Sequence, residues 1–272
     1  MIYNPLPGEY VASAIKRGNE SICTNTFSKE DYVIKNIPKK ERSQHSDDII
    51  FPKLFIDHGV TREVLYHNTL FPLTIALGRN LTKTMFTPIY SWKICLDCVA
   101  ENVKIFGTAY IHCSHLLASV RVCSVHGSKL FDRCPTCLKK VTSHKIGKFI
   151  KCCNSYQLSP REIGSMKHSY SVFTSELLKY DGRHFETYDV NKAINIKLEL
   201  MGLLKDDGNY DLLVERMNNQ LELSFTSESF YQPSTDVCAA SGFLAYQTTD
   251  AYLNSLNDKS VWISMLEELR KQ

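Results

Sequence analysis

The sequence lacks the features that would direct a chain into or across a membrane. None of its 272 residues falls in an apolar run as long as a membrane span, and the first residues are not a basic segment followed by an apolar one. Hydrophobic residues make up 43% of the chain and charged residues 22%, as in an ordinary globular protein. We therefore expect a soluble, unexported, cytoplasmic protein with no membrane partner.

Sequence signatures of zinc and cysteine enzymes are also missing. Neither Cys95 nor Cys134 follows a proline, so the Pro-Cys-x2-Cys part of the zinc deaminase signature is absent. His112, Cys113 and His115 could be further metal ligands or a cysteine-histidine nucleophile pair, but no third group that would orient them can be identified. We expect these three to be packing or surface residues, and the protein not to be an enzyme.

Cysteine, in contrast, is abundant and clustered. Seven of the ten cysteines fall in four motifs, which are Cys95-x2-Cys98, Cys123-x2-His126, Cys134-x2-Cys137 and Cys152-Cys153. A two-residue spacer lets both ligands of a tight knuckle face one ion. In a chain without a signal peptide, this paired spacing favours reduced, metal-bound thiols over disulfides. Zinc is the expected metal, and iron in an all-cysteine site stays possible.

The spacing predicts two metal sites. Cys95, Cys98, Cys123 and His126 would complete the first, which leaves no position for water and is therefore structural rather than catalytic. Cys134 and Cys137 would begin the second, with Cys152 as third ligand. The fourth ligand stays open between Cys153, His144 and water, because adjacent cysteines rarely reach one ion without strain. An empty second site with buried cysteines is the alternative.

Helical signals flank the metal region. The sequence predicts a helix from Tyr10 to Arg17 that stops at Gly18-Asn19. It predicts a loop over residues 35–48 and another helix around Pro52. Thr61 would cap a helix that Pro72 breaks. Between the first two ligand pairs, the sequence predicts a helix or strand over residues 106–117 and a strand over residues 120–122. Further helices are expected over 189–202, 211–221, 237–246 and 260–269, where apolar stripes are more typical of core than of a docking groove.

We therefore expect a mainly α protein with small zinc-knuckle β elements. Its parts would be an N-terminal helix-turn-helix-like unit (1–90), a central tandem zinc-binding region (91–158) and a C-terminal helical unit (159–272). The helix-turn-helix pattern is weak, since most such helix pairs are core packing.

Charge is unevenly distributed along the chain. Residues 129–183 hold eleven Lys and Arg against four Asp and Glu, whereas residues 184–272 hold seven against fourteen. A basic segment that overlaps a metal-stabilised module is typical of phosphate contact, although it can also be a solvated face. The candidate nucleic-acid contacts are Lys139, Lys140, Lys145, Lys148 and Lys151.

Three segments together resemble the TniQ/TnsD family of target-selection proteins of bacterial DNA transposons. They are Leu6-Pro7-Gly8-Glu9 before a short helix with Arg17, then 68–72 (Asn-Thr-Leu-Phe-Pro), then the ordered ligand pairs with His126-Gly127 and Asp132-Arg133-Cys134. The resemblance covers residues 4–153. Cys152-Cys153 stands where the family has a final Cys-x2-Cys pair.

The resemblance implies a role in bacterial DNA transposition. Longer members of the family append domains that read an attachment site in DNA, whereas shorter ones resemble adaptors. For this short chain it implies a noncatalytic, dimeric adaptor that links a Cascade-like CRISPR effector and its guide RNA to a TnsC-like AAA+ ATPase at target DNA. Sequence-specific DNA binding by the N-terminal helices is the alternative, and a zinc hydrolase or cysteine enzyme is a third.

Overall fold

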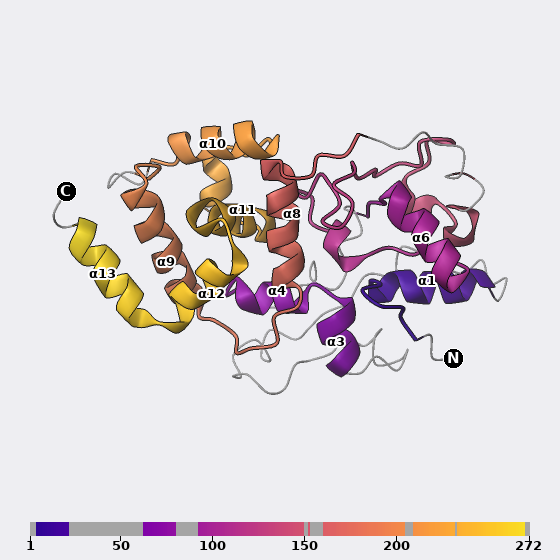
Figure 1. Ribbon diagram of the computed structural model, residues 1–272, viewed down its shortest axis with the longest axis horizontal. Coiled ribbons are helices and arrows are strands. Elements are labelled where there is room, and N and C mark those ends of the chain that lie inside the picture. The colour runs from indigo at the N-terminus through magenta and orange to yellow at the C-terminus, as the bar shows by residue number, and fades with distance from the viewer. Residues whose placement is uncertain are drawn as a thin grey trace. The chain divides into compact units, whose positions relative to one another are not determined.

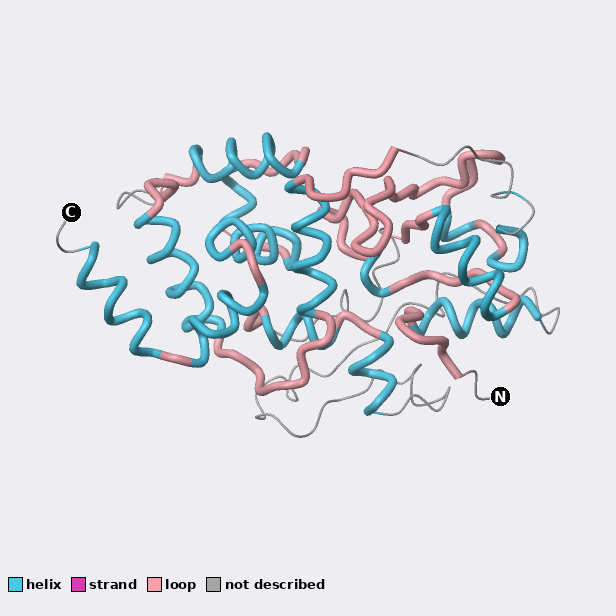
Figure 2. The backbone as a smooth tube through the Cα atoms, viewed as in Figure 1, coloured by secondary structure: helices cyan, strands magenta, loops and turns pink. Residues whose placement is uncertain are grey.

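The computed structural model describes residues 4–21, 62–79, 92–149, 152, 160–204, 209–231 and 233–269. The chain forms two compact units. The first comprises Met1–Pro72, Leu81–Leu116 and Ser128–Pro160, and the second comprises Leu73–Asn80, Leu117–Gly127 and Arg161–Gln272. The described residues are mainly helical and include no strand, which confirms the mainly α class (Figure 2). The three-part division at residues 90 and 158 stays a prediction.

The first unit is built from short helices joined by long loops. It contains α1 (Val11–Ser21), α3 (Arg62–Asn68), α6 (Leu96–Phe106) and three single-turn 3-10 helices, which are η4 (Cys113–His115), η5 (Val141–Ser143) and η6 (Ile146–Lys148). Such short helices are marginal on their own in water, so contacts between elements must stabilise them.

The predicted N-terminal helix is confirmed, but its predicted stop at Gly18 is wrong. α1 continues to Ser21 because its last turn is anchored from outside. Lys16 Nζ donates a hydrogen bond to the carbonyl of Thr142 at 2.5 Å, and the Glu20 carboxylate accepts one from the Ile146 amide at 2.7 Å. These tertiary bonds outweigh the low helix propensity of glycine.

A buried carboxylate organises the start of the first unit. Glu9 is fully buried, and its oxygens accept hydrogen bonds from the Leu6 amide, the Ser13 hydroxyl and the Arg17 guanidinium. The Arg17 contact is an ion pair of 2.8 Å. The side chain of Asn68, at the end of α3, donates to the carbonyls of Glu9 at 2.7 Å and of Leu6 at 3.2 Å. The turn before α1 therefore fixes the position of α3.

Isolated bridges take the place of the β elements predicted around the knuckles. In the described residues they pair Glu9 with His112, Ile94 with Phe131 and Arg133 with Lys140. Ile94 and Phe131 exchange two backbone hydrogen bonds of 2.9 Å. The pairing does not extend because the knuckle turns redirect the chain within a few residues.

The helix or strand predicted over 106–117 is wrong, since after Phe106 that segment contains only the 3-10 turn η4. The helix α6, which was not predicted, precedes it and ends at Phe106, because Gly107, at φ +72°, turns the chain. Val120–Val122 is likewise no strand. Pro72 does not end a helix: it lies in the first turn of α4 (Phe71–Ala76), where no backbone N–H is needed. The loop predicted at 35–48 and the helix predicted around Pro52 lie outside the described residues.

The second unit packs its helices around α11 (Thr235–Tyr246). Every residue of α11 from Val237 to Tyr246 is buried. The surrounding helices are α8 (Met166–Leu177), α9 (Thr187–Leu200), α10 (Asp211–Leu221) and α12 (Thr249–Asn257), while α13 (Lys259–Leu269) packs along α9 (Figure 1). Tyr170, Phe173, Phe243 and Tyr252 fill the core between α8, α11 and α12. A 3-10 turn, η7 (Ser227–Phe230), precedes α11.

The predicted C-terminal helices are confirmed as α9, α10, α11 and α13, whereas the sequence did not indicate α8 and α12. Among the described helices, none combines the length and the apolar composition needed to cross a membrane.

Two glycines with the same left-handed backbone give a matched test of the fold. A Cβ on Gly127 (φ +65°) would lie 2.7 Å from Ile163 Cγ1 and 3.0 Å from the Ile163 amide, whereas one on Gly107 (φ +72°) would meet nothing within 4 Å. Gly107→Ala should cost about 1–2 kcal/mol for the backbone conformation alone. Gly127→Ala should cost clearly more, and chemical denaturation followed by circular dichroism measures both. Equal losses would contradict the close approach at Ile163.

Candidate metal centres

Cys95 and Cys98 lie together at the start of α6. Cys95 is the N-cap residue, with an extended backbone at φ −96° and ψ 131°, and its carbonyl accepts a hydrogen bond from the Val99 amide at 3.0 Å. Residues three apart on a helix share a face, so both sulfurs can point toward one position. Both residues are buried. The N-terminus of a helix also favours the thiolate form of a cysteine.

A tight turn brings Cys123 and His126 together. The Gly127 amide donates to the Cys123 carbonyl at 2.8 Å, and the positive φ of Gly127 lets the chain leave directly after the histidine. Cys123 Sγ and His126 Nδ1 lie 3.6 Å apart. Tetrahedral zinc, with Zn–S of about 2.3 Å and Zn–N of about 2.0 Å, separates such a pair by about 3.6 Å. A thiol–imidazole hydrogen bond has a similar length, so this distance alone does not distinguish a metal site from a hydrogen bond. The positions of the other two sulfurs make that distinction.

Cys95, Cys98, Cys123 and His126 form one group, here called the first tetrad. Their ligand atoms all lie within 4.8 Å of one another, and all four residues are buried. Two sulfurs on one tetrahedral zinc ion lie about 3.8 Å apart, so the spacing suits a single small ion. Three thiolates and an imidazole are soft donors that suit zinc and not magnesium or calcium. The first tetrad could thus hold a metal ion with four protein ligands.

Asp97 and Ser128 support the first tetrad from outside. Asp97, between the two cysteines of α6, is buried, and the Ser128 hydroxyl donates a hydrogen bond to its Oδ2 atom. That oxygen lies 4.0 Å from Cys95 Sγ. Because a metal-bound Cys95 thiolate has no proton to donate to Asp97, the support comes through the Ser128–Asp97 bond, which ties the chain after His126 to the first turn of α6. Sequence reasoning treated Asp97 as a spacer, although an acid between two ligands was a signal that could have been used.

Cys134, Cys137, His144 and Cys152 form the second tetrad. Their ligand atoms also lie within 4.8 Å of one another. The knuckle closes through the Leu138 amide, which donates to the Cys134 carbonyl at 2.8 Å, and the Thr136 hydroxyl donates to the Cys152 carbonyl. Cys134 is buried, but Cys137 is exposed and Cys152 half-buried. The second tetrad could also hold a metal ion, on a side of the first unit that solvent reaches.

His144 is the group that the sequence left open as fourth ligand. Its Nδ1 atom lies 2.7 Å from the Lys145 carbonyl, and its ring stacks on Phe149 with centroids 4.3 Å apart. A carbonyl can only accept, so Nδ1 carries the proton and a neutral ring presents Nε2 as the metal-binding nitrogen. The structure thus brings His144 to the three cysteines. Cys153 lies outside the described residues.

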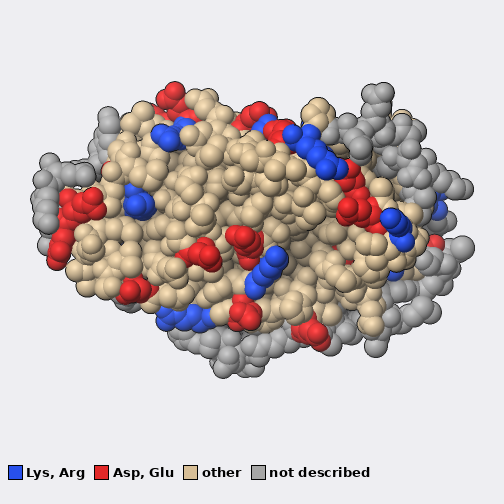
Figure 3. Space-filling model, in the orientation of Figure 1, with Lys and Arg blue, Asp and Glu red and all other residues tan. Residues whose placement is uncertain are grey.

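The candidate nucleic-acid contacts lie on exposed loops of the first unit. Lys139 and Lys140 follow the Cys137 knuckle, Lys145 and Lys148 flank η6, and all four are exposed. Lys151 lies outside the described residues. On the face drawn in Figure 3, basic and acidic side chains of the described residues are interspersed and neither sign gathers into a broad patch. Phosphate contact on that face would depend on local groups rather than on a large field.

Comparisons with known proteins leave the family open. A scan against protein-family models finds no matching model, and a search of curated proteins finds no match. The resemblance to TniQ/TnsD proteins therefore stays a prediction based on this chain's own residues.

Loss of a first-tetrad ligand should unfold the central region. His126→Ala or Cys98→Ala would leave three ligands, and a structural zinc contributes about 10 kcal/mol or more to the folding of small modules. Zinc content by mass spectrometry and thermal melting measure the effect. Cys113→Ala is the control, since Cys113 is buried in the same unit outside both tetrads. Ligand variants that keep their zinc and their melting behaviour would show that the assignment is wrong.

The fourth ligand of the second tetrad can be tested separately. His144→Ala should lose one metal ion per chain and leave the first tetrad loaded, whereas Cys153→Ala should keep both ions. Cobalt(II) substitution should give a three-sulfur spectrum that changes in His144→Ala. His67→Ala, an exposed histidine on α3, is the control. Loss of the second ion in Cys153→Ala but not in His144→Ala would assign Cys153 instead.

Proposed function

We propose that the chain is a zinc-stabilised, noncatalytic target-selection adaptor of the TniQ type, acting in bacterial DNA transposition. It would link a Cascade-like CRISPR effector with its guide RNA to a TnsC-like AAA+ ATPase at target DNA, as a homodimer in the bacterial cytoplasm. One observation carries the proposal: two of the sequence segments on which the family resemblance rests, the turn before α1 and the stretch that begins at Asn68, are joined by hydrogen bonds in the folded chain.

The meeting point is the turn before α1. Asn68, from the second segment, donates to the carbonyls of Leu6 and Glu9 in the first. The loop beyond α6, inside the metal region, bonds to the same turn: the Cys113 amide donates to the Gly8 carbonyl at 2.9 Å. Two chance matches 59 residues apart in the sequence have no particular reason to come into contact. Their convergence supports a shared family core.

We propose zinc in both tetrads, with a structural role. The donors are three thiolates and one imidazole in each tetrad, at the spacing of a single tetrahedral ion. Bound zinc would supply no reaction step, because four protein ligands leave no position for water. The hydrogen bond to the Lys145 carbonyl would hold His144 in orientation, and the Ser128–Asp97 bond would hold the chain beside the first tetrad.

The environment of Cys113 supports a noncatalytic role. Burial raises the pKa of the Cys113 thiol far above its usual value, and the nearby Glu9 charge raises it further. A thiol that stays protonated at neutral pH is a poor nucleophile. The neighbouring His112 ring is bound to the Asn102 side chain at 2.8 Å. These residues behave as packing groups.

Affinity capture tests the proposed function. The tagged full chain is expressed in cells that carry its native neighbours and recovered at moderate salt, and bound protein and nucleic acid are identified. We expect a CRISPR effector with its guide RNA, or an AAA+ ATPase. Glu9→Ala with Arg17→Ala disrupts the family core and should lose these partners, whereas Asp250→Ala, an exposed acid on α12, should keep them.

Two outcomes would contradict the adaptor. Recovery of one DNA segment without RNA would favour a direct reader of an attachment site, in which case mismatches in that segment should cost about 1–3 kcal/mol each. Turnover of a substrate that His126→Ala abolishes while the fold survives would instead indicate an enzyme.

A further inference from the structure

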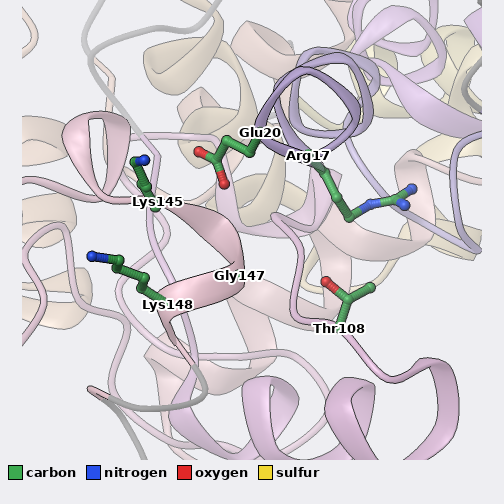
Figure 4. Close-up of a pocket in the computed structure, with 6 residues that line it drawn as sticks. All are labelled: Arg17, Glu20, Thr108, Lys145, Gly147 and Lys148. Carbon is green, nitrogen blue, oxygen red and sulfur yellow. The ribbon is translucent and has the colours of Figure 1, made fainter. Parts of the chain in front are cut away.

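A hollow of about 170 Å³ opens in the first unit between α1 and the loop of η6 (Figure 4). The residues that line it are Arg17, Glu20, Thr108, Lys145, Gly147 and Lys148. We propose that this hollow binds a phosphodiester group of a nucleic acid strand, held by Lys145 and Lys148. The inference rests on the proposed function only in that a nucleic acid belongs to the assembly.

Two of the charged groups that line the hollow are already compensated. The Arg17 guanidinium is paired with the buried Glu9 carboxylate at 2.8 Å. The Glu20 carboxylate accepts from the Ile146 amide and lies 4.0 Å from the buried ammonium of Lys16. Neither group therefore leaves a full charge for a ligand.

Lys145 and Lys148 supply the excess charge. Both are exposed and, within the described residues, neither makes a close ion pair, although the Lys145 ammonium attracts the Glu20 carboxylate from a longer distance. In Figure 4 both side chains lie on the side of Glu20 away from Arg17. Two neighbouring ammonium groups match the oxygens of one phosphate as point charges.

The backbone that carries these lysines is held in place. The Lys145 carbonyl lies 2.7 Å from His144 Nδ1 and accepts from the Lys148 amide at 3.1 Å, while the next amide, of Ile146, is bonded to Glu20. Phe149, directly after Lys148, is fully buried and stacks on His144. Little backbone entropy would be lost on binding, which favours affinity.

The openness of the hollow favours a strand over a free anion. Small-molecule sites bury most of their ligand, but Lys145, Gly147 and Lys148 are all exposed. A phosphodiester needs one open side, because the strand must enter and leave. The exposed Lys139 and Lys140 earlier in the same loop would add contacts along a strand and none to a free phosphate.

Gly147 provides a second probe. A Cβ on this residue would meet nothing within 4 Å, and its φ is not in the left-handed region. Gly147→Ala should therefore fold normally and place a methyl group in the open space where a phosphate would approach the backbone.

The test is fluorescence anisotropy of the full chain with labelled single-stranded RNA and DNA of roughly 12 nucleotides, titrated between about 50 and 200 mM salt. Lys145→Gln and Lys148→Gln should each weaken binding several-fold and lower the salt slope by about 0.7, the value for one lost phosphate contact on a single strand. Gly147→Ala should weaken binding with an unchanged melting temperature. Lys129→Gln, an exposed lysine outside the hollow, should bind like the wild type.

Three outcomes would overturn the inference. In the first, the Lys145→Gln and Lys148→Gln variants bind the strand like the wild type; in the second, the Lys129→Gln variant weakens binding as much as those two variants do. In the third, millimolar inorganic phosphate displaces the strand completely, which would indicate a site for free phosphate. The RNA and DNA arms identify the strand. If the hollow binds the strand but neither an effector nor an ATPase is captured, this inference stands and the proposed function fails. If an effector or an ATPase is captured but the lysine variants bind the strand like the wild type, the proposed function stands and this inference fails.

Discussion

Four ligand atoms within 4.8 Å of one another, on four buried residues, are the constraint on which the centre of the chain depends. Thiolates held this close repel one another, and burial of each charge is costly unless a cation compensates it. A helix N-terminus at Cys95 reduces that cost, while the glycine that turns the chain after His126 and the hydrogen bond between Ser128 and Asp97 fix the backbone that carries the ligands. The second tetrad obeys the same chemistry with less burial, since Cys137 is exposed. Its ion would therefore exchange more readily than that of the first.

The second constraint is the buried Glu9 carboxylate. Among the described residues of the first unit the longest helices have 11 residues, so helix propensity alone cannot stabilise them. Glu9 bonds to the residues before α1, to the first turns of α1 and to Arg17, and its own carbonyl accepts from Asn68 at the end of α3. Removal of either charge would leave the other buried or half-buried without a partner, which is the expensive case for an ion pair. The Glu9 carboxylate thus holds the turn before α1 against that helix, and the backbone carbonyls of the same turn hold α3.

Local signals in the sequence predicted the parts of the structure that depend on neighbouring residues. The ligand pairs with two-residue spacers lie together, and α10 has the predicted bounds because its apolar stripe of Leu213, Met217 and Leu221 is a local pattern. Contacts between distant residues were not predictable in this way. His144 has no fixed spacing to the knuckle cysteines, and Asn68 reaches Glu9 across 59 residues. α8 was missed because its Ser- and Thr-rich sequence carries a weak apolar stripe, and its burial against α11 stabilises it instead.

At the attachment of α1 to the loop of the second tetrad, two charged groups fix the position of the helix although their burial lowers the stability of the fold. Burial lowers the pKa of Lys16 and raises that of Glu20, while their mutual attraction only partly opposes both shifts. For each group the folded state disfavours the charged form, so at neutral pH both make an unfavourable contribution to the free energy of folding. The Lys16 contribution would fade as the pH rises toward the ordinary pKa of lysine, and the Glu20 contribution as the pH falls toward that of glutamate. Because the hydrogen bonds to Thr142 and Ile146 flank His144, the pair ties α1 to the segment that completes the second tetrad. Burial of the two charges costs stability, whereas their hydrogen bonds fix α1 to a ligand-bearing loop, and the geometry that they maintain includes the wall of the basic hollow.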